Sequence, residues 1–169
     1  IRKGEVNVQV LTPQSIANVF YKSNKKVYDV IIPNTYLLPH QGESDLLCIR
    51  PSLFIDEIEI KISKSDYLAD FDKEVMFKDD NYLRVNKHKA AADGLLGCNR
   101  HYFLMPIELA EQIEVPNHCG LLGVTSGRWI RTIKSAPMLH KRKATLEMIY
   151  RASAAASSKY WNLTESLLD

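Results

Sequence analysis

The residues best suited to chemistry form a short run, Glu57-Ile58-Glu59-Ile60-Lys61. Charged and apolar residues alternate along it, a pattern typical of a β-strand with two unlike faces. Glu57, Glu59 and Lys61 share one face, while the isoleucines share the other, which is suited to burial. The charged face is therefore either a solvent-exposed surface with a modest Glu59–Lys61 ion pair or part of an active site.

A further acidic residue can come within reach of this face. Asp45 lies near the start of the predicted strand 44–49, and a short turn connects that strand to the predicted strand 53–62. If the two strands form a hairpin, the carboxylates of Asp45 and Glu59 come close together and suit Mg²⁺ or Mn²⁺ as metal ligands. Lys61 beside that ion can orient water and neutralise charge on a phosphate. We therefore predict metal-dependent phosphodiester hydrolysis, with Asp45, Glu59 and Lys61 as catalytic residues.

The Glu-x-Lys motif alone does not decide between these explanations, because chance matches to two such common residues are frequent. If Asp45 and Glu59 lie far apart, the charged strand is only a solvated face of a structural or partner-binding protein. Other enzyme classes find little support. The sequence has no P-loop, no glycine-rich dinucleotide motif, no Gly-x-Ser-x-Gly and no zinc-ligand spacing.

The surrounding pattern predicts a mixed sheet with helices on its faces. Thr12-Pro13 is typical of a helix start, and apolar spacing extends that helix to about Asn24, after a short predicted strand over 5–11. Pro33-Asn34 predicts a turn. Ser63 with Asp66 three residues later predicts the start of a helix directly after the charged strand.

The second half of the chain continues this alternation of strands and helices. Residues 72–86 have no regular pattern, strands are predicted at 101–105 and 119–125, and 129–133 is expected at a sheet edge. A long terminal helix is predicted at about 141–161, with Leu146, Ile149, Tyr150 and Tyr160 against the core. The fold class predicted from these elements is α/β.

Composition places the chain among globular proteins with a single domain. A length of 169 residues with 46% apolar and 25% charged residues is enough for one domain, 1–169, with its own core. No apolar stretch is long enough to cross a membrane, and no leader sequence is recognisable. Three widely spaced cysteines are expected to be reduced core thiols, so a cytoplasmic (intracellular) location is predicted.

Asp45, thirteen intervening residues, and then Glu59-x-Lys61 between two helices resemble the motif of the PD-(D/E)xK, or restriction-endonuclease-like, superfamily. A more specific resemblance, over roughly 40–135, is to the MmcB-like family of DNA-repair nucleases. The segments that carry it are EIEIKISKSDYLADF (57–71), KHK (87–89), NRHYFLMP (99–106) and VPNHCGLLGV (115–124).

This resemblance implies a three-layer α/β/α sandwich with a mixed central sheet, a bound Mg²⁺ or Mn²⁺, and DNA as the substrate. The implied role is DNA repair, recombination or phage DNA processing. Cutting two DNA strands is simplest with two sites, so a homodimer is compatible with it. Four residues are candidate DNA-phosphate contacts: Ser63, Lys64, Lys87 and Lys89. A helix cap for the first pair and a solvated helix face for the second pair are their alternative explanations.

The chain departs from the superfamily pattern at two places. Ser44 stands where the motif has proline, and the first helix lacks the acidic residue that many relatives carry, for which Glu43 or Glu57 is a candidate substitute. Some members of the superfamily bind DNA without cutting it. The alternative function is therefore a non-catalytic nucleic-acid-binding accessory module on the same fold, which would show steep salt dependence.

Overall fold

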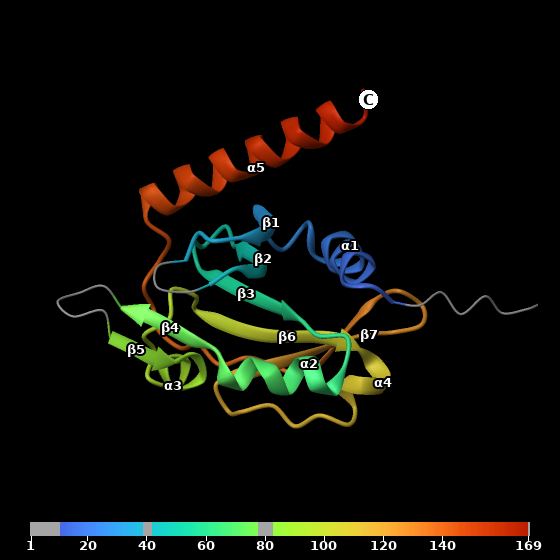
Figure 1. The fold of residues 1–169 in the computed structure, drawn as a ribbon, viewed down its shortest axis with the longest axis vertical. Helices are drawn as coiled ribbons and strands as arrows, with labels where there is room; N and C mark the ends of the chain where they lie inside the picture. The colour runs from blue at the N-terminus through green and yellow to red at the C-terminus, as the bar shows by residue number, and fades with distance from the viewer. Residues whose placement is uncertain (1–10, 39–41, 78–82, 169) are drawn as a thin grey trace, which may run out of the picture.

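The structure is a computed structural model that describes residues 11–38, 42–77 and 83–168. Most of the strand predicted at 5–11 lies outside these residues. The elements, shown in Figure 1, are α1 (Pro13–Asn24), β1 (Val30–Thr35), β2 (Ser44–Ile49), β3 (Ile55–Ile60), α2 (Lys64–Ala69), a 3-10 turn η1 (Asp70–Asp72), β4 (Glu74–Phe77), β5 (Leu83–Asn86), α3 (Lys87–Ala92), β6 (Arg100–Pro106), α4 (Ile107–Ala110), β7 (Cys119–Val124), β8 (Ile130–Lys134) and α5 (Leu146–Ser166).

Six of the strands form one mixed sheet in the order β1-β2-β3-β6-β7-β8. The β2–β3 hairpin is antiparallel, β3, β6 and β7 run parallel to one another, and β8 returns antiparallel at the edge. Parallel neighbours need crossover segments, and the segments after β3 and β6 carry α2, α3 and α4. This confirms the predicted α/β class with a mixed sheet, the hairpin and the edge position of β8.

Alternating residues of the strands divide the core between the two faces of the sheet. Ile58 and Leu104 pack with Ile16 and Phe20 of α1 on one face. Phe103 on the other face packs with α2 and α4, and a further cluster there joins Leu47 to α3 and α5. Helices therefore pack on both faces of the sheet.

Local capping explains why the elements around β3 begin where they do. The Thr12 side chain accepts a hydrogen bond from the amide of Ser15 and Pro13 opens α1, as predicted. Ser63 caps α2 in the same way by accepting from the amide of Asp66. The predicted turn at Pro33-Asn34 is wrong, because both residues lie inside β1, which is an edge strand and tolerates proline.

Residues 72–86 contain a β-hairpin that the sequence did not predict. β4 and β5 pair antiparallel, with Val75 opposite Val85, as a separate two-stranded sheet. Each strand has four residues, and Val75 alone among the eight is buried, so the alternation was too short to recognise. The hairpin follows α2 and η1 and leads directly into α3 (Figure 1).

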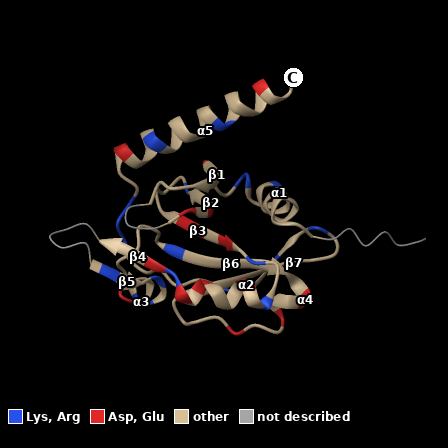
Figure 2. Cartoon of the chain, in the orientation of Figure 1, with Lys and Arg blue, Asp and Glu red and all other residues tan. Residues whose placement is uncertain are grey.

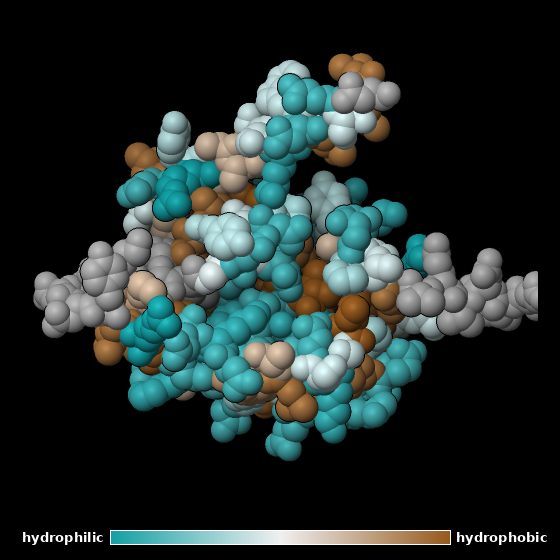
Figure 3. Space-filling view, in the orientation of Figure 1, coloured by the Kyte–Doolittle hydropathy of each residue, from teal (hydrophilic) through white to brown (hydrophobic). Residues whose placement is uncertain are grey.

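The terminal helix begins and packs differently from the prediction. α5 starts at Leu146 because Thr145 caps it, not at about 141, and it runs to Ser166. Ala152 is its one buried residue within 146–166. Of the expected core residues, Ile149 packs against the core, whereas Leu146, Tyr150 and Tyr160 are exposed. Figure 1 shows α5 extending away from the sheet, and Figure 3 shows apolar residues exposed near its end. No helix among the described residues is long and apolar enough to cross a membrane.

Candidate functional site

The charged face of β3 is buried inside the protein. Glu57, Glu59 and Lys61 are 1%, 1% and 4% exposed, so the solvated-face explanation of this strand is wrong. In Figure 2 the acidic positions interrupt the middle of the sheet, between its neighbours β2 and β6. Buried charges are costly unless they are paired, and each of these three charges has partners of opposite sign.

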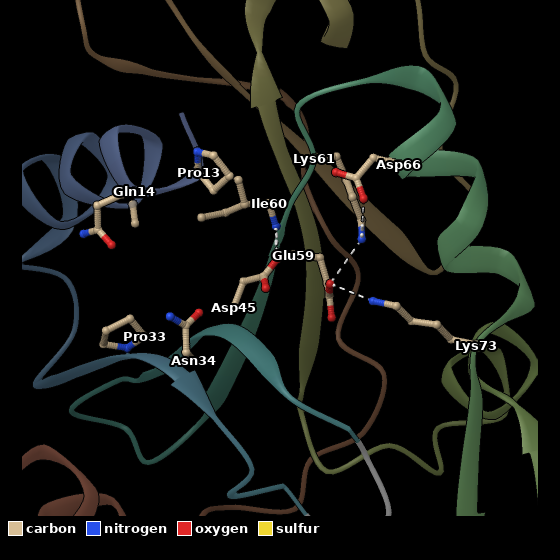
Figure 4. A pocket seen from close by; sticks show the side chains of 11 residues that line it. Pro13, Gln14, Pro33, Asn34, Asp45, Glu59, Ile60, Lys61, Asp66 and Lys73 are labelled. Atoms are coloured by element: carbon tan, nitrogen blue, oxygen red, sulfur yellow. Dashed lines mark hydrogen bonds and ion pairs between the residues drawn. The ribbon is translucent and has the colours of Figure 1, made fainter. Parts of the chain in front are cut away.

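Asp45, Glu59 and Lys61 line one pocket of about 280 Å³ at the end of β3. The start of α1 and the middle of β1 form the opposite wall, and Asp66 and Lys73 complete it. Figure 4 shows the carboxyl groups of Asp45 and Glu59 pointing into the same space, with Lys61 and Lys73 beyond Glu59. The hairpin register explains this convergence, because Leu46 pairs with Ile58, and Asp45 and Glu59 are the residues that follow at this end of the hairpin.

Asp45 is a half-buried carboxylate whose charge is disfavoured. Its Oδ2 accepts a hydrogen bond of 2.7 Å from the amide of Ile60. Burial raises the pKa of Asp45, and the negative charge of Glu59 raises it further, against the opposing effects of the Ile60 amide, Lys61 and Lys73. Two carboxylates that repel each other across a pocket favour a cation between them.

Glu59 is held by three ammonium groups. Its Oε1 accepts a hydrogen bond of 2.7 Å from Lys87 Nζ, and its Oε2 lies 3.2 Å from Lys73 Nζ and 3.4 Å from Lys61 Nζ. The Lys61 and Lys87 side chains are buried, whereas that of Lys73 is 44% exposed. Lys73 is thus the ammonium that can leave Glu59 at the lowest cost, because its charge can move into water.

Asp70 joins these lysines to a histidine. Its Oδ1 accepts from Lys61 at 2.9 Å and from Lys73 at 2.6 Å, and its Oδ2 lies 3.1 Å from Nε2 of His88. Burial alone would raise the pKa of Asp70, but His88 and the lysines outweigh it and hold the pKa far below its ordinary value. Asp70 therefore fixes the Lys61 ammonium beside Glu59.

Glu57 lies deeper than the pocket and is not one of its lining residues. It accepts hydrogen bonds from Ser44 Oγ at 2.7 Å and pairs with His101 Nδ1 at 2.9 Å. Burial alone would raise the pKa of Glu57, but Lys87, His101 and Ser44 together hold it well below 4.5. Ser44, which stands where the superfamily has proline, thus has a structural role as a donor to Glu57.

The remaining predicted residues are divided between surface and interior. Lys87 is buried against Glu59 and Glu57 and does not lie on a surface where DNA could contact it, so its role as a phosphate contact is not supported. Lys89 is exposed and pairs with Asp93. Ser63 caps α2 and Lys64 is exposed beside it. Glu43 accepts from Tyr36 Oη outside the pocket lining.

Sequence reasoning missed Asp70, Lys73 and His88 as members of this charged network. A weak signal was present, because Asp70 belongs to the helix pattern after Lys61, and KHK (87–89) was singled out. Lys73 lies in the stretch that was expected to be irregular. Their partners lie nine to eighteen residues away in the sequence: Asp70 contacts Lys61, Lys73 contacts Glu59 and His88 contacts Asp70. No local pattern encodes such contacts.

Comparisons with known proteins place the fold but no activity. No family model matches the sequence, and no curated protein does either. The structure is similar to that of SPO1766, a protein of unknown function from Silicibacter pomeroyi, with a TM-score of 0.62 and 17% sequence identity over 95% of this chain and 94% of that one. At this identity the likeness concerns the fold alone.

Proposed function

We propose that this protein is a Mg²⁺- or Mn²⁺-dependent nuclease of the PD-(D/E)xK type that hydrolyses phosphodiester bonds in DNA. The observation that carries the proposal is the convergence of Asp45, Glu59 and Lys61 on one pocket at the end of the β2–β3 hairpin. The mixed sheet with helices on both faces supports the finer fold proposal, a three-layer α/β/α sandwich of the restriction-endonuclease-like kind.

The donor set of the pocket fits a hard divalent cation. Asp45 and Glu59 supply carboxylate oxygens on neighbouring strands. Burial first, and the charge of Glu59 second, raise the pKa of Asp45, and a cation bound at Asp45 would offset both effects. The two carboxylates would hold the ion, which supplies Lewis-acid chemistry by polarising a phosphate and lowering the pKa of a bound water. Lys73, with its exposed side chain, is the ammonium that would move off Glu59 to admit it.

The lysines give the pocket its preference for an anionic substrate. Lys61 is kept in place by Glu59 on one side and Asp70 on the other, so its ammonium is oriented before a substrate arrives. In the proposed reaction Lys61 orients the attacking water and neutralises charge that develops on the phosphate. Lys73 also pairs with Asp70 at 2.6 Å, and this second carboxylate would keep its ammonium near the pocket when it leaves Glu59. A cytoplasmic location belongs to this proposal.

A second function on the same fold has its own supporting observation. Both oxygens of Glu59 already accept from ammonium groups, so this carboxylate is neutralised without a metal ion. A protein that binds nucleic acid without cutting it would keep this arrangement permanently. Such a module would bind DNA with steep salt dependence and would cleave no DNA with either metal.

The deciding experiment is a cleavage panel of single-stranded, duplex, nicked and mismatched DNA with Mg²⁺ and with Mn²⁺. Asp45→Asn is the best test variant, because Asp45 is half-buried and an asparagine oxygen can still accept from the Ile60 amide. We expect wild-type cleavage to disappear in Asp45→Asn and to fall at least about 100-fold in Lys61→Met. Asp93→Asn, an exposed acid outside the pocket, is the matched control and should cut normally.

Two results separate the alternatives. If Asp45→Asn cuts as fast as the wild type, the assignment of the site is wrong. If the wild type cuts nothing under any condition but binds DNA with salt-dependent affinity, the non-catalytic module is the correct function.

A further inference from the structure

Three ligand atoms of a different chemical kind meet on the far side of Asp70 from the pocket. His88 Nδ1 lies 3.0 Å from His118 Nε2 and 3.9 Å from Cys119 Sγ, and the three atoms are all within 4.8 Å of one another. In a tetrahedral zinc site, bonds of about 2.05 and 2.3 Å put two nitrogens about 3.3 Å apart and a nitrogen and a sulfur about 3.6 Å apart. We propose that His88, His118 and Cys119 bind one divalent ion of the zinc type.

A carboxylate orients the central ligand as metal sites require. Asp70 is ion-paired with Lys61 and Lys73, so it is a hydrogen-bond acceptor, and it lies 3.1 Å from His88 Nε2. Nε2 of His88 therefore carries the proton, and the lone pair of Nδ1 faces His118 and Cys119. Metal-bound histidines almost always donate their other ring nitrogen to a carboxylate, carbonyl or water in this way. Phe71, stacked on the His88 ring at 4.3 Å, fixes its plane.

The donor types distinguish this site from the Asp45–Glu59 pocket. Thiolate and imidazole ligands select zinc-type ions, whereas the carboxylates of the pocket suit Mg²⁺ or Mn²⁺. His118 is partly exposed, and the residues before it, including Pro116 and Asn117, line a shallow surface hollow. Three protein ligands leave a fourth position for water or another donor.

A buried nitrogen beside the cluster is also unsatisfied. His101 Nε2 is buried and has no hydrogen-bond partner among the described residues. The His101 ring stands edge-on to His88, with centroids 6.1 Å apart, and His101 pairs with Cys119 in the β6–β7 register. Buried polar atoms in proteins nearly always have a partner, so an orphan next to three ligands marks polar surroundings that a bound ion and its water can complete.

A second group of candidate ligands, Glu57, Cys98 and His101, is a weaker site. All three residues are buried, which leaves no route for an ion. Glu57 and His101 already pair with each other at 2.9 Å, and Glu57 also holds Lys87. Cys98 therefore serves as a control thiol for the proposed site.

The ion would connect α3 to the main sheet. His88 belongs to α3, which follows the separate β4–β5 hairpin, whereas His118 and Cys119 stand at the start of β7 in the main sheet. Binding to the folded state alone stabilises a protein in proportion to the logarithm of the ion concentration over Kd. Zinc should therefore raise the melting temperature of the full chain.

Co²⁺ tests the site directly because its absorption reports the ligands. The full chain, with any affinity tag removed, is stripped of metal and titrated with Co²⁺. We expect one equivalent to give the visible bands of tetrahedral cobalt and a near-ultraviolet thiolate charge-transfer band. Cys119→Ala should lose the charge-transfer band, while Cys48→Ala and Cys98→Ala should keep it. Zn²⁺ should displace the Co²⁺ and abolish the spectrum.

A second variant keeps the test decisive if Cys119→Ala folds poorly. His118 is partly exposed, so His118→Ala should fold normally and weaken Zn²⁺ binding at least about tenfold in competition with a chromophoric chelator. The zinc-induced rise in melting temperature should shrink with it. No charge-transfer band in the wild type, a band that survives Cys119→Ala, or a band lost in Cys98→Ala would each overturn the proposal. None of these readouts depends on nuclease activity.

Discussion

The stability of Glu59 variants provides the most direct test of the buried ion-pair network. Removing one partner of a buried pair costs about 3 to 5 kcal/mol when the other charge stays buried. In Glu59→Ala, Lys61 and Lys73 keep Asp70 at 2.9 and 2.6 Å, and only Lys87 is left with a distant partner, Glu57 at 3.8 Å. Since one ammonium is stranded and not three, we expect the lower end of that range, about 3 kcal/mol.

Glu59→Gln should cost less than Glu59→Ala. The amide oxygen of glutamine can still accept from the Lys87 ammonium, and the two lost contacts are those from Lys61 and Lys73, which both keep Asp70. We therefore expect a loss of about 1.5 to 2 kcal/mol. Adding Lys87→Met to Glu59→Ala removes the stranded charge. The double variant should therefore lose less than the sum of the two single variants, by at least about 1 kcal/mol.

The assay is urea unfolding at neutral pH without divalent ions, followed by circular dichroism, with unchanged m values as evidence of a common fold. Glu74→Ala is the control, because Glu74 pairs with Arg84 on the surface at 3.8 Å, and its loss should change stability by less than about 0.5 kcal/mol. If Glu59→Ala matches this control, or if Glu59 and Lys87 contribute additively, the buried network described above is wrong.

This prediction also changes how active-site variants are interpreted. A loss of about 3 kcal/mol is a large part of the 5 to 15 kcal/mol that stabilises a typical domain. Reduced cleavage by Glu59→Ala could then reflect unfolding as much as chemistry. Asp45→Asn avoids this ambiguity, which is why it is the preferred variant for testing the proposed nuclease.

Three further predictions concern the charges around the pocket. Folding raises the pKa of Asp45 above 3.8, so its charge destabilises the folded state at higher pH. In metal-free buffer at pH 7, Asp45→Asn should therefore have a higher urea midpoint than the wild type, and this advantage should fade below pH 3.8. A lower midpoint at pH 7 would contradict this. Folding lowers the pKa of Glu57, so its charge stabilises the fold above pH 4.5 and does so less as the pH falls below that value. The loss of stability in Glu57→Gln should therefore be largest at neutral pH and should shrink in acid. A loss of stability that does not depend on pH would argue against this. Lys73→Met removes the exposed ammonium from Glu59 and should tighten Mn²⁺ binding in calorimetric titration. Lys89→Met, outside the pocket, is the control and should bind Mn²⁺ as the wild type does. Equal affinities of Lys73→Met and the wild type would mean that Lys73 does not compete with the ion.

The sequence predicted the elements whose signals are local. Thr12-Pro13 and Ser63 mark helix starts through their own side chains, and both helices begin there. The alternation through Ile58 and Ile60 with a short preceding turn predicted the β2–β3 hairpin, and with it the meeting of Asp45 and Glu59. Such features need only a few neighbouring residues, so one chain without relatives is enough to recognise them.

Features that depend on partners far along the chain were not predictable in this way. α5 has the spacing of a core helix, yet only residues of its first half pack on the core, namely Met148, Ile149 and Ala152. Large apolar residues later in the helix, such as Trp161 and Leu163, are exposed. The β4–β5 hairpin has strands too short for a clear period. Lysine is a surface residue by default, so the burial of Lys87 follows only from the two glutamates that face it across the sheet.

The buried charges at β3 depend on partners from later in the chain. This dependence made their burial hard to predict from sequence, and it also bears on the proposed function. A strand with Glu57, Glu59 and Lys61 in the middle of a sheet can be stable only if helices from later in the chain bring matching charges to it. α3 brings Lys87 and the segment after α2 brings Asp70 and Lys73. Apolar residues at these positions would stabilise the fold more than paired charges do. Polar or charged residues in a core are expected mainly at functional sites. This network opens into a pocket at Asp45, and that opening is the physical argument for the proposed chemistry.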